Sequence, residues 1–331
     1  MNSKIDFVVT WVDGNDPDWL REREQYMPQK VDSGSSANRF RDWGLMKYWF
    51  RGVEKFAPWV NKVYFVTWGH YPEWLNLNHP KLTLVNHKDY IPHEFLPTYN
   101  TNVLELNLHR IHELSEQFVL FNDDVFLTSP TKTTDFFREG LPCDVALLGQ
   151  LSALSPDDVF PHMILNNMAV INKYFDKRTV IKENWHKFFS LKYGTEIFRN
   201  MLLYKARYFS CFYEPHLTVP FRKGTFQEVW EKEPAILEQM CNNRFRTKDD
   251  LTDWLFKAWQ ICKGQFVPRR CDWGKCFGIG EDMDIASSIK SGKFKVVCLN
   301  DSNPDIDFEE EQAKMIEAFE SILPEKCSFE L

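Results

Sequence analysis

The sequence predicts an α/β fold with a mostly parallel sheet and flanking helices. Two observations support this prediction. Strand-like apolar runs alternate with helical patterns in the first half of the chain, and polar residues follow several of these runs where parallel strands would end. After about Pro156 the pattern becomes helical and aromatic. We therefore expect an α/β part at residues 1–155 and a mainly helical part at 156–331, which returns a strand near 294–300 to the core.

Short apolar runs mark the strands. Phe118–Phe121 is apolar throughout, as expected for a strand that is buried on both faces. The predicted strands are Ile5–Val12, Lys62–Trp68, Leu82–Asn86, Gln117–Phe121 and Val145–Leu148.

Apolar residues recur with helical spacing in two intervening segments, which predicts helices over Asp42–Phe56 and Asn102–Glu116. Asp42 is the expected N-cap of the first helix, and Pro58 follows it as a stop signal. The segment Lys30–Ala37, rich in Ser and Gly, is predicted to be a mobile loop.

Composition excludes several classes of protein. The formal charge is −7 and no long run of Lys or Arg occurs, which argues against nucleic-acid binding. No apolar segment approaches the ~20 residues needed to cross a bilayer, so we expect no transmembrane segment and a cytoplasmic location. The eight cysteines are irregularly spaced, and Cys271 and Cys276 do not make a zinc-knuckle pair. We expect mostly reduced thiols, with a disulfide as the less favoured interpretation.

Two adjacent acids, Asp123 and Asp124, follow the buried run at the point where its strand would leave the sheet. Carboxylates at this position are costly unless a cation meets them, and ligands of α/β proteins bind at this edge. A divalent metal carrying a phosphorylated substrate explains them most simply. A later strand-like run also ends in Asn300 and Asp301, which could share the same metal.

The turn after the first strand, Thr10–Pro17, carries two further acids. Asp13 and Asp16 could contact a ribose or a metal, or could simply cap the next helix. We favour a functional role for Asp13 and weigh both roles equally for Asp16.

Other polar residues have both a functional and a structural interpretation. Arg39 could clamp a phosphate or be a solvated arginine at a helix start. Asn100 could cap the second helix, on which we favour Arg110 over His109 and His112 as a functional residue.

Two further candidates lie in the second half of the chain. His216, in a proline-rich turn, could be a general base, although most such histidines are structural. Arg246 lies near Asp249 and Asp250, so surface ion pairs are its structural interpretation.

Four blocks together resemble the Stealth family of sugar-1-phosphate transferases. They are Ile5–Gly14, motifs between Arg39 and Phe126, Pro215–His216 with Arg246 and Asp250, and Cys298–Asp301. The family includes bacterial capsule phosphotransferases and the catalytic subunit of the N-acetylglucosamine-1-phosphotransferase that tags lysosomal enzymes. The resemblance covers most of the chain and assigns no role to His162.

The resemblance implies a glycosyltransferase-A-like, nucleotide-sugar-binding core and a specific reaction. A glycan hydroxyl would attack the phosphorus next to the sugar of a nucleotide sugar, typically UDP-N-acetylglucosamine or a relative. A hexose-1-phosphate, with N-acetylhexosamine-1-phosphate favoured, would join the acceptor through a phosphodiester, and a nucleoside monophosphate would leave. The acceptor would be a polysaccharide or a lipid-linked glycan of the capsule or cell surface. A lipid-linked acceptor would also be compatible with a protein that binds peripherally to the inner face of the membrane.

The resemblance also implies residue roles. His216 would take the proton of the acceptor, and Arg246 and Arg39 would stabilise phosphate charge. Mg²⁺ or Mn²⁺ would be held by Asp123, Asp124, Asn300 and Asp301, and Asp124 also counts as catalytic. The expected nucleotide-sugar-binding residues are Thr10, Trp11, Val12, Asp13, Asn100 and Arg110.

Two alternatives remain at this point. An ordinary metal-dependent glycosyltransferase would use the same pocket but release a nucleoside diphosphate. A non-catalytic carbohydrate-binding protein would release no nucleotide, and its sugar binding would survive EDTA.

Overall fold

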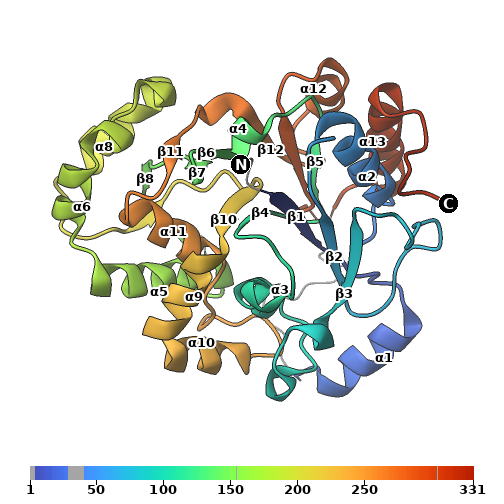
Figure 1. The fold of residues 1–331 in the computed structure, drawn as a ribbon, viewed down its shortest axis with the longest axis horizontal. Helices are drawn as coiled ribbons and strands as arrows, with labels where there is room; N and C mark the ends of the chain where they lie inside the picture. Colours follow the sequence, from blue (N-terminus) through green and yellow to red (C-terminus); the bar gives the residue numbers. More distant parts are fainter. Residues whose placement is uncertain (1–3, 29–40, 154, 304) are drawn as a thin grey trace.

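The computed structural model describes residues 4–28, 41–153, 155–303 and 305–331. Its centre is a five-stranded sheet in the order β10-β4-β1-β2-β3 (Figure 1). The four neighbouring strands β4, β1, β2 and β3 are parallel, and only β10 is antiparallel. The strands are β1 (Ile5–Thr10), β2 (Val63–Thr67), β3 (Leu82–Asn86), β4 (Gln117–Phe121) and β10 (Val219–Arg222). The predicted α/β architecture with a mostly parallel sheet is confirmed.

Both faces of this sheet are covered, which explains why its strands are continuous apolar runs. In β1, Phe7 packs in the core cluster that includes helix α2 (Met46–Phe56). The next residue, Val8, points the other way into the cluster that includes α3 (Thr101–Leu106). Alternate residues of one strand therefore stabilise two separate helical layers.

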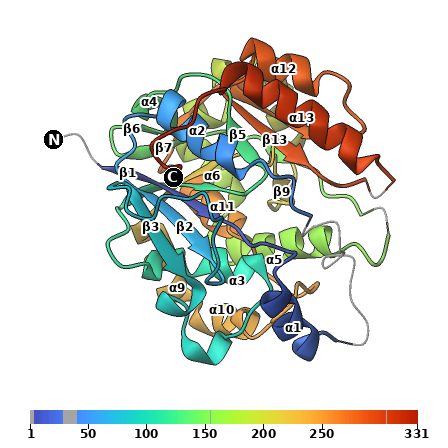
Figure 2. The ribbon, with the colours of Figure 1, turned by 90° about the vertical axis from the view of Figure 1, so that its right-hand side faces the viewer.

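A second, three-stranded sheet adjoins the first. It pairs β12 (Gly274–Gly278) with β13 (Val296–Asn300) and then with β5 (Val125–Leu127). Helices α12 (Ile285–Ser291) and α13 (Phe308–Ile322) pack together beside it (Figure 2). The strand expected near 294–300 corresponds to β13, which pairs with β5. Because β5 follows β4 almost at once, the two sheets meet at residues 122–124.

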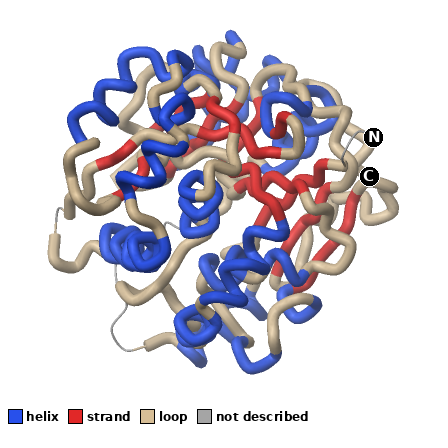
Figure 3. Tube along the Cα trace, turned by 60° about the vertical axis from the view of Figure 1, so that its left-hand side comes forward, coloured by secondary structure: helices blue, strands red, loops and turns tan. Residues whose placement is uncertain are grey.

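The chain after residue 156 is mainly helical, and Figure 3 shows helices on the outside of the strands. The helices are α5 (Val159–Tyr174), α6 (Lys177–Glu183), α7 (Trp185–Phe188), α8 (Ile197–Leu203), α9 (Lys223–Lys232), α10 (Pro234–Cys241) and α11 (Trp254–Cys262). Smaller elements are α1 (Pro17–Tyr26), α4 (Thr133–Phe136), β6 (Phe137–Arg138), β7 (Leu141–Asp144), β8 (Leu148–Gly149), β9 (Cys211–Phe212) and β11 (Val267–Pro268). No helix within the described ranges is long and apolar enough to span a bilayer.

Two predicted helices are shorter than expected. The first begins at Met46, and Asp42 does not cap it, because its carboxylate accepts the Gly44 N–H instead. The second ends at Leu106, where the Asn107 side chain donates to the Val103 carbonyl and a 3-10 turn follows.

The predicted strand Val145–Leu148 is largely wrong, since only Leu148 belongs to a paired strand. Side chains satisfy its backbone instead. The Tyr193 hydroxyl accepts from Ala146 N–H, and Asn200 binds both the Ala146 carbonyl and the Leu148 N–H. These two side chains make the backbone hydrogen bonds that a neighbouring strand would otherwise make. The predicted loop Lys30–Ala37 lies outside the described residues.

Candidate functional site

The junction of the two sheets holds the two acids, Asp123 and Asp124, in a tight turn. The Val125 N–H donates to the Asn122 carbonyl at 3.1 Å, and the Leu299 N–H donates to the Asp124 carbonyl at 2.8 Å. The Asp124 backbone is thus fixed between the end of β4 and the neighbouring strand β13.

Three side chains from distant parts of the chain meet at this point. Asp124 Oδ2 lies 3.7 Å from His216 Nε2 and 3.5 Å from Cys298 Sγ. The three donor atoms all lie within 4.8 Å of one another, close enough to share one metal ion. Asp124 Oδ1 is buried and accepts no hydrogen bond from any described residue. A buried, unpaired carboxylate oxygen fits a cation better than it fits an apolar wall.

His216 has an unusual backbone conformation, with φ at +49°, and its ring lies edge-on to Trp254. Burial disfavours the charged ring, but the Asp124 carboxylate outweighs burial and raises the pKa of His216 to about 9. A ring with this pKa is protonated at neutral pH. Neutralising the charge of Asp124, as a bound cation would do, removes the cause of the raised pKa and lets more of the rings accept a proton.

A second group of charges acts on Asp123. Desolvation by the surrounding protein and the Asp124 carboxylate raise the pKa of Asp123 to about 7, and Arg246 opposes this shift. The same Arg246 also acts on Glu105 and Asp253, two buried carboxyls whose pKa values are raised mainly by burial. Arg246 is therefore within electrostatic reach of three acids, one of which, Asp123, lies at the junction of the two sheets.

A buried network around Asp250 holds the Arg246 loop. Asn100 Nδ2 donates to Asp250 Oδ2 at 2.7 Å, and Asn243 Nδ2 donates to Oδ1 at 2.9 Å. Thr247 adds a bond to Oδ1, and the Tyr99 N–H donates to the Arg244 carbonyl. The structure places Asn100, which is fully buried and caps α3, in this network.

Asn300 and Asp301 lie at the end of β13. The Asn300 carbonyl accepts the Ile279 N–H at 3.0 Å. Asp301 Oδ2 lies 3.6 Å from Arg41 Nη1 and accepts the Trp43 indole N–H at 3.1 Å. Asp301 thus ties the segment before α2 to this end of the strand.

The turn after β1 contacts His70. Asp13 N–H donates to His70 Nε2 at 2.8 Å, and the Trp11 ring lies edge-on to His70. Thr10 is buried at the end of the strand, and Val12 continues the turn. Asp16 caps α1 through the N–H groups of its first turn, as its structural interpretation predicted.

Arg110 does not join this group. Its Nε donates to Asn107 Oδ1, and its guanidinium lies 4.7 Å from the Trp230 ring. It belongs to the turn that precedes β4, near the opposite edge of the sheet from Asp124. Arg39 lies outside the described residues.

Comparison with known proteins identifies the family. Residues 3–31 match the family model described as Stealth protein CR1, conserved region 1, and residues 39–143 match Stealth protein CR2, conserved region 2. The capsular polysaccharide phosphotransferase WcwK of Streptococcus pneumoniae is 44% identical over 99% of this chain and 98% of the relative. The chain belongs to the Stealth family. The resemblance seen in the sequence is confirmed, and this Stealth protein is a phosphotransferase.

Other relatives agree. The receptor polysaccharide phosphotransferase WefC of Streptococcus gordonii is 42% identical over the whole of both chains. The exopolysaccharide phosphotransferase cps2G of Lactiplantibacillus plantarum is 40% identical over 98% of this chain and 96% of the relative. Among solved structures, the galactosyltransferase LgtC with donor and acceptor sugar analogues shares 9% identity over 96% of each chain at a TM-score of 0.41. That likeness is distant.

Several residues of this Stealth protein were not predicted as part of the site. Cys298 and its neighbour in the register, Cys276, are strand cysteines, which in a sequence look like ordinary core residues. Glu105 lies on α3, and only the fold shows that it is buried within electrostatic reach of Arg246. Its neighbours three and four positions earlier on the helix, Asn102 and Thr101, are polar, so the charge of Glu105 gave no distinctive sequence signal.

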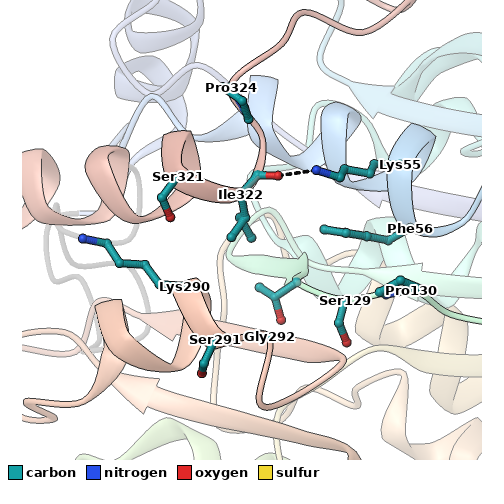
Figure 4. A pocket seen from close by; sticks show the side chains of 11 residues that line it. Lys55, Phe56, Ser129, Pro130, Lys290, Ser291, Gly292, Ser321, Ile322 and Pro324 are labelled. Carbon is teal, nitrogen blue, oxygen red and sulfur yellow. Dashed lines mark hydrogen bonds between the residues drawn. The ribbon is translucent and has the colours of Figure 1, made fainter.

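A separate surface cavity of about 430 Å³ lies between the end of α2 and helices α12 and α13 (Figure 4). Lys55 and Lys290 line it, and Lys55 donates to the Ile322 carbonyl at 2.7 Å. None of the lining residues belongs to the groups around Asp124 or Arg246.

Acid should destabilise this Stealth protein through His87, which is buried at the end of β3. Burial, aided by His70, lowers the pKa of His87 to about 3. Below pH 6.5, the ordinary pKa of histidine, His87 binds a proton in the unfolded chain but stays neutral in the folded chain. The free energy of unfolding therefore falls as the pH drops from 6.5 towards 3. The contribution of His87 between pH 7 and pH 5 is about 2 kcal/mol.

Urea unfolding at both pH values measures this effect. His87→Met should reduce the loss of unfolding free energy by that amount, whereas His112→Gln, at an exposed histidine, should leave it unchanged. An identical loss in His87→Met and the parent chain would contradict the prediction.

Proposed function

We propose that this chain transfers a hexose-1-phosphate, favouring N-acetylhexosamine-1-phosphate, from a nucleotide sugar to a glycan hydroxyl. The favoured donor is a UDP-linked sugar, and the group that leaves is the nucleoside monophosphate. The product is a phosphodiester in a capsular or other surface polysaccharide. One observation carries the proposal. His216 lies 3.7 Å from Asp124 at the junction of the two sheets, and Arg246 acts electrostatically on the adjacent Asp123. This supports roles for His216 as proton acceptor, Arg246 as phosphate-binding residue and Asp124 as cation ligand. The names of the relatives support the acceptor class.

The residues divide the work of phosphoryl transfer, which needs positioning and charge neutralisation more than covalent help. His216 Nε2 would take the proton of the attacking hydroxyl. Arg246, held by the Asp250 network, would bind the oxygens of the transferred phosphate in place of its present acidic neighbours. Arg39 is proposed for the same role.

A Mg²⁺ or Mn²⁺ ion fits the donors at the junction. Asp124 offers its unpaired Oδ1, and Asp123 offers a second carboxylate. Asn300 and Asp301 lie at the end of β13, the strand that pairs with β5 just after these acids, and are proposed to complete the set. When bound, the cation would neutralise charge on the diphosphate of the donor.

The turn after β1 is proposed to bind the nucleotide. Trp11 and Asp13 lie where a base and a ribose would meet the carboxyl edge of the sheet, with Thr10 and Val12 beside them. Asn100 would act indirectly, through the Asp250 network. Arg110, near the other edge, is the residue of the predicted set that this geometry supports least.

The nucleotide product tests the proposal. The chain is incubated with a panel of nucleotide sugars and a polysaccharide acceptor, and ³¹P NMR follows the products. Release of a nucleoside monophosphate together with a phosphodiester signal is expected. Release of a nucleoside diphosphate would instead support an ordinary glycosyltransferase, and sugar binding that survives EDTA without any nucleotide release would support a carbohydrate-binding protein.

Zinc should inhibit the enzyme through Cys298. Ligand atoms around a tetrahedral zinc lie about 3.3–3.8 Å apart, as bond lengths of 2.0–2.3 Å require. The distances from Asp124 to His216 and to Cys298 fall in this range. A thiol and an imidazole also favour zinc over magnesium.

We expect Cys298→Ser to raise the inhibitory zinc concentration at least about tenfold, because the site loses its thiolate. Cys271→Ser, which removes a partly exposed thiol elsewhere, is the matched control. Competition between the protein and a zinc-binding dye measures the same shift without turnover. Equal zinc affinity of the parent chain and Cys298→Ser would contradict the prediction.

A further inference from the structure

Large exposed apolar side chains concentrate in one short segment. Six of them lie between residues 185 and 208, and together we call them the α7–α8 surface: Trp185, Leu191, Phe198, Met201, Leu202 and Tyr208. Leu191 is 92% exposed and Leu202 is 81% exposed, so their side chains have almost no protein around them. Helices α6 and α8 extend at the upper left of Figure 1, on the far side of the fold from β3. Exposed apolar side chains gathered in this way mark an interaction surface.

Helix α8 is amphipathic, and a polar anchor fixes its orientation. Asn200 is buried, donates to the Ala146 and Phe188 carbonyls, and accepts the Leu148 N–H. Phe198, Met201 and Leu202 are spaced i, i+3 and i+4, so they share one face of the helix. The hydrogen bonds of Asn200 hold one face of α8 against the protein. The face of α8 that carries Phe198, Met201 and Leu202 is exposed.

An aromatic side chain extends the surface onto α7. The Trp185 ring stacks on Phe189 with ring centres 3.7 Å apart and meets Tyr204 edge-on at 6.0 Å. Half of Trp185 is nevertheless exposed. A rigid ring with an apolar body and a polar N–H is typical of side chains at a membrane–water interface.

The charge of this segment is opposite to that of the whole chain. Residues 185–208 contain five Lys and Arg residues against one Glu, a formal charge of +4, whereas the chain carries −7. Lys205 and Arg207 are exposed, next to Tyr208. Lys192, also exposed, donates to the Pro268 carbonyl at the base of the surface. The apolar side chains are therefore flanked by positive charge.

We propose that the α7–α8 surface docks on a phospholipid membrane that carries anionic headgroups. Exposed Leu, Phe and Trp side chains would enter the boundary between headgroups and acyl chains, and the Lys and Arg residues would meet the phosphates. Charge complementarity favours this occupant over an apolar protein partner, because a purely apolar partner would leave the basic residues without counter-charges.

The α7–α8 surface is connected to the candidate active site through strands β8 and β9, so docking could orient this site towards the membrane. Helix α8 packs on β8, which pairs with β9, and β9 ends four residues before His216. Docking would hold this side of the active site at the membrane. An acceptor glycan carried by a lipid would then reach His216 from the bilayer, a consequence that rests on the proposed function.

Vesicle co-sedimentation of the full chain tests the docking without any sugar nucleotide. Vesicles of phosphatidylcholine with phosphatidylglycerol should bind the chain, and phosphatidylcholine alone should bind it much less. The double variant Phe198→Asp, Leu202→Asp should lower the partition coefficient at least about tenfold. Met283→Asp, at a fully exposed methionine outside the segment, is the matched control and should bind like the parent chain.

Two further measurements separate the possible failures. Phosphotransfer to a water-soluble acceptor should be unchanged in the double variant, which shows that the fold and the active site are intact. Equal vesicle binding by the parent chain and the double variant would overturn the proposal. So would light scattering that shows self-association in the parent chain, lost in the double variant, without vesicle binding, because the occupant would then be a second copy of the chain.

Discussion

Asp124→Asn should lower kcat at least about a thousandfold while the fold persists. The substitution keeps the size of the side chain but removes the charge that faces His216 and Cys298. An amide is a much weaker cation ligand than a carboxylate, and the buried Oδ1 has no other described partner. The main-chain bond from Leu299 to the Asp124 carbonyl stays in place, so the turn between β4 and β5 should form normally.

Steady-state kinetics and thermal unfolding together test this prediction. Asp249→Asn is the matched control, because Asp249 is exposed in the loop next to Arg246 and contacts none of the three clustered donors. The control should retain its activity. If Asp124→Asn retained its turnover at an unchanged Tm, Asp124 would not be a ligand of an essential metal ion.

The second large effect is expected from His216→Asn. Loss of the proton acceptor should lower kcat by about 10²–10⁴-fold and leave the affinity for the donor sugar nearly unchanged. Asn is chosen over Ala because His216 has a positive φ, which Asn tolerates better than most residues. The backbone between β9 and β10 should therefore keep its path in the variant.

Donor affinity is measured by calorimetry and turnover by nucleotide release. Glu113→Asn, at an exposed position that also has a positive φ, controls for the backbone effect of the substitution. An increase in donor KM with an unchanged kcat would show that His216 binds the donor and is not the base.

The sequence alone could predict the parts of the site that follow strands. Asp123 and Asp124 were found because a buried strand must end before two charged residues, and Asn300–Asp301 repeated that pattern. The local sequence made His216 and Arg246 candidates but favoured structural roles for them, and only the family resemblance gave them functional roles. The structure brings His216 to Asp124 and Arg246 to Asp123.

The rest depends on tertiary contacts that leave no local signal. Cys298 points towards Asp124 because β13 pairs with β5, and the pairing of strands so far apart in the sequence cannot be read from periodicity. The same limit explains the error at Val145–Leu148. An apolar run predicts a strand, but Tyr193 and Asn200 satisfy its backbone in place of a strand partner.

The pairing of β5 with β13 also sets the time at which the enzyme can become active. The contact between Asp124 and Cys298 spans 174 residues, and β13 is translated after every strand of the central sheet, of which β10 is the last in the sequence. Contacts of such long range form late, because a large loop must close first. Until then the strand that follows Asp124 lacks the neighbour that fixes it. A nascent chain that has already built its central sheet should therefore stay inactive until β13 has been made and has paired with β5.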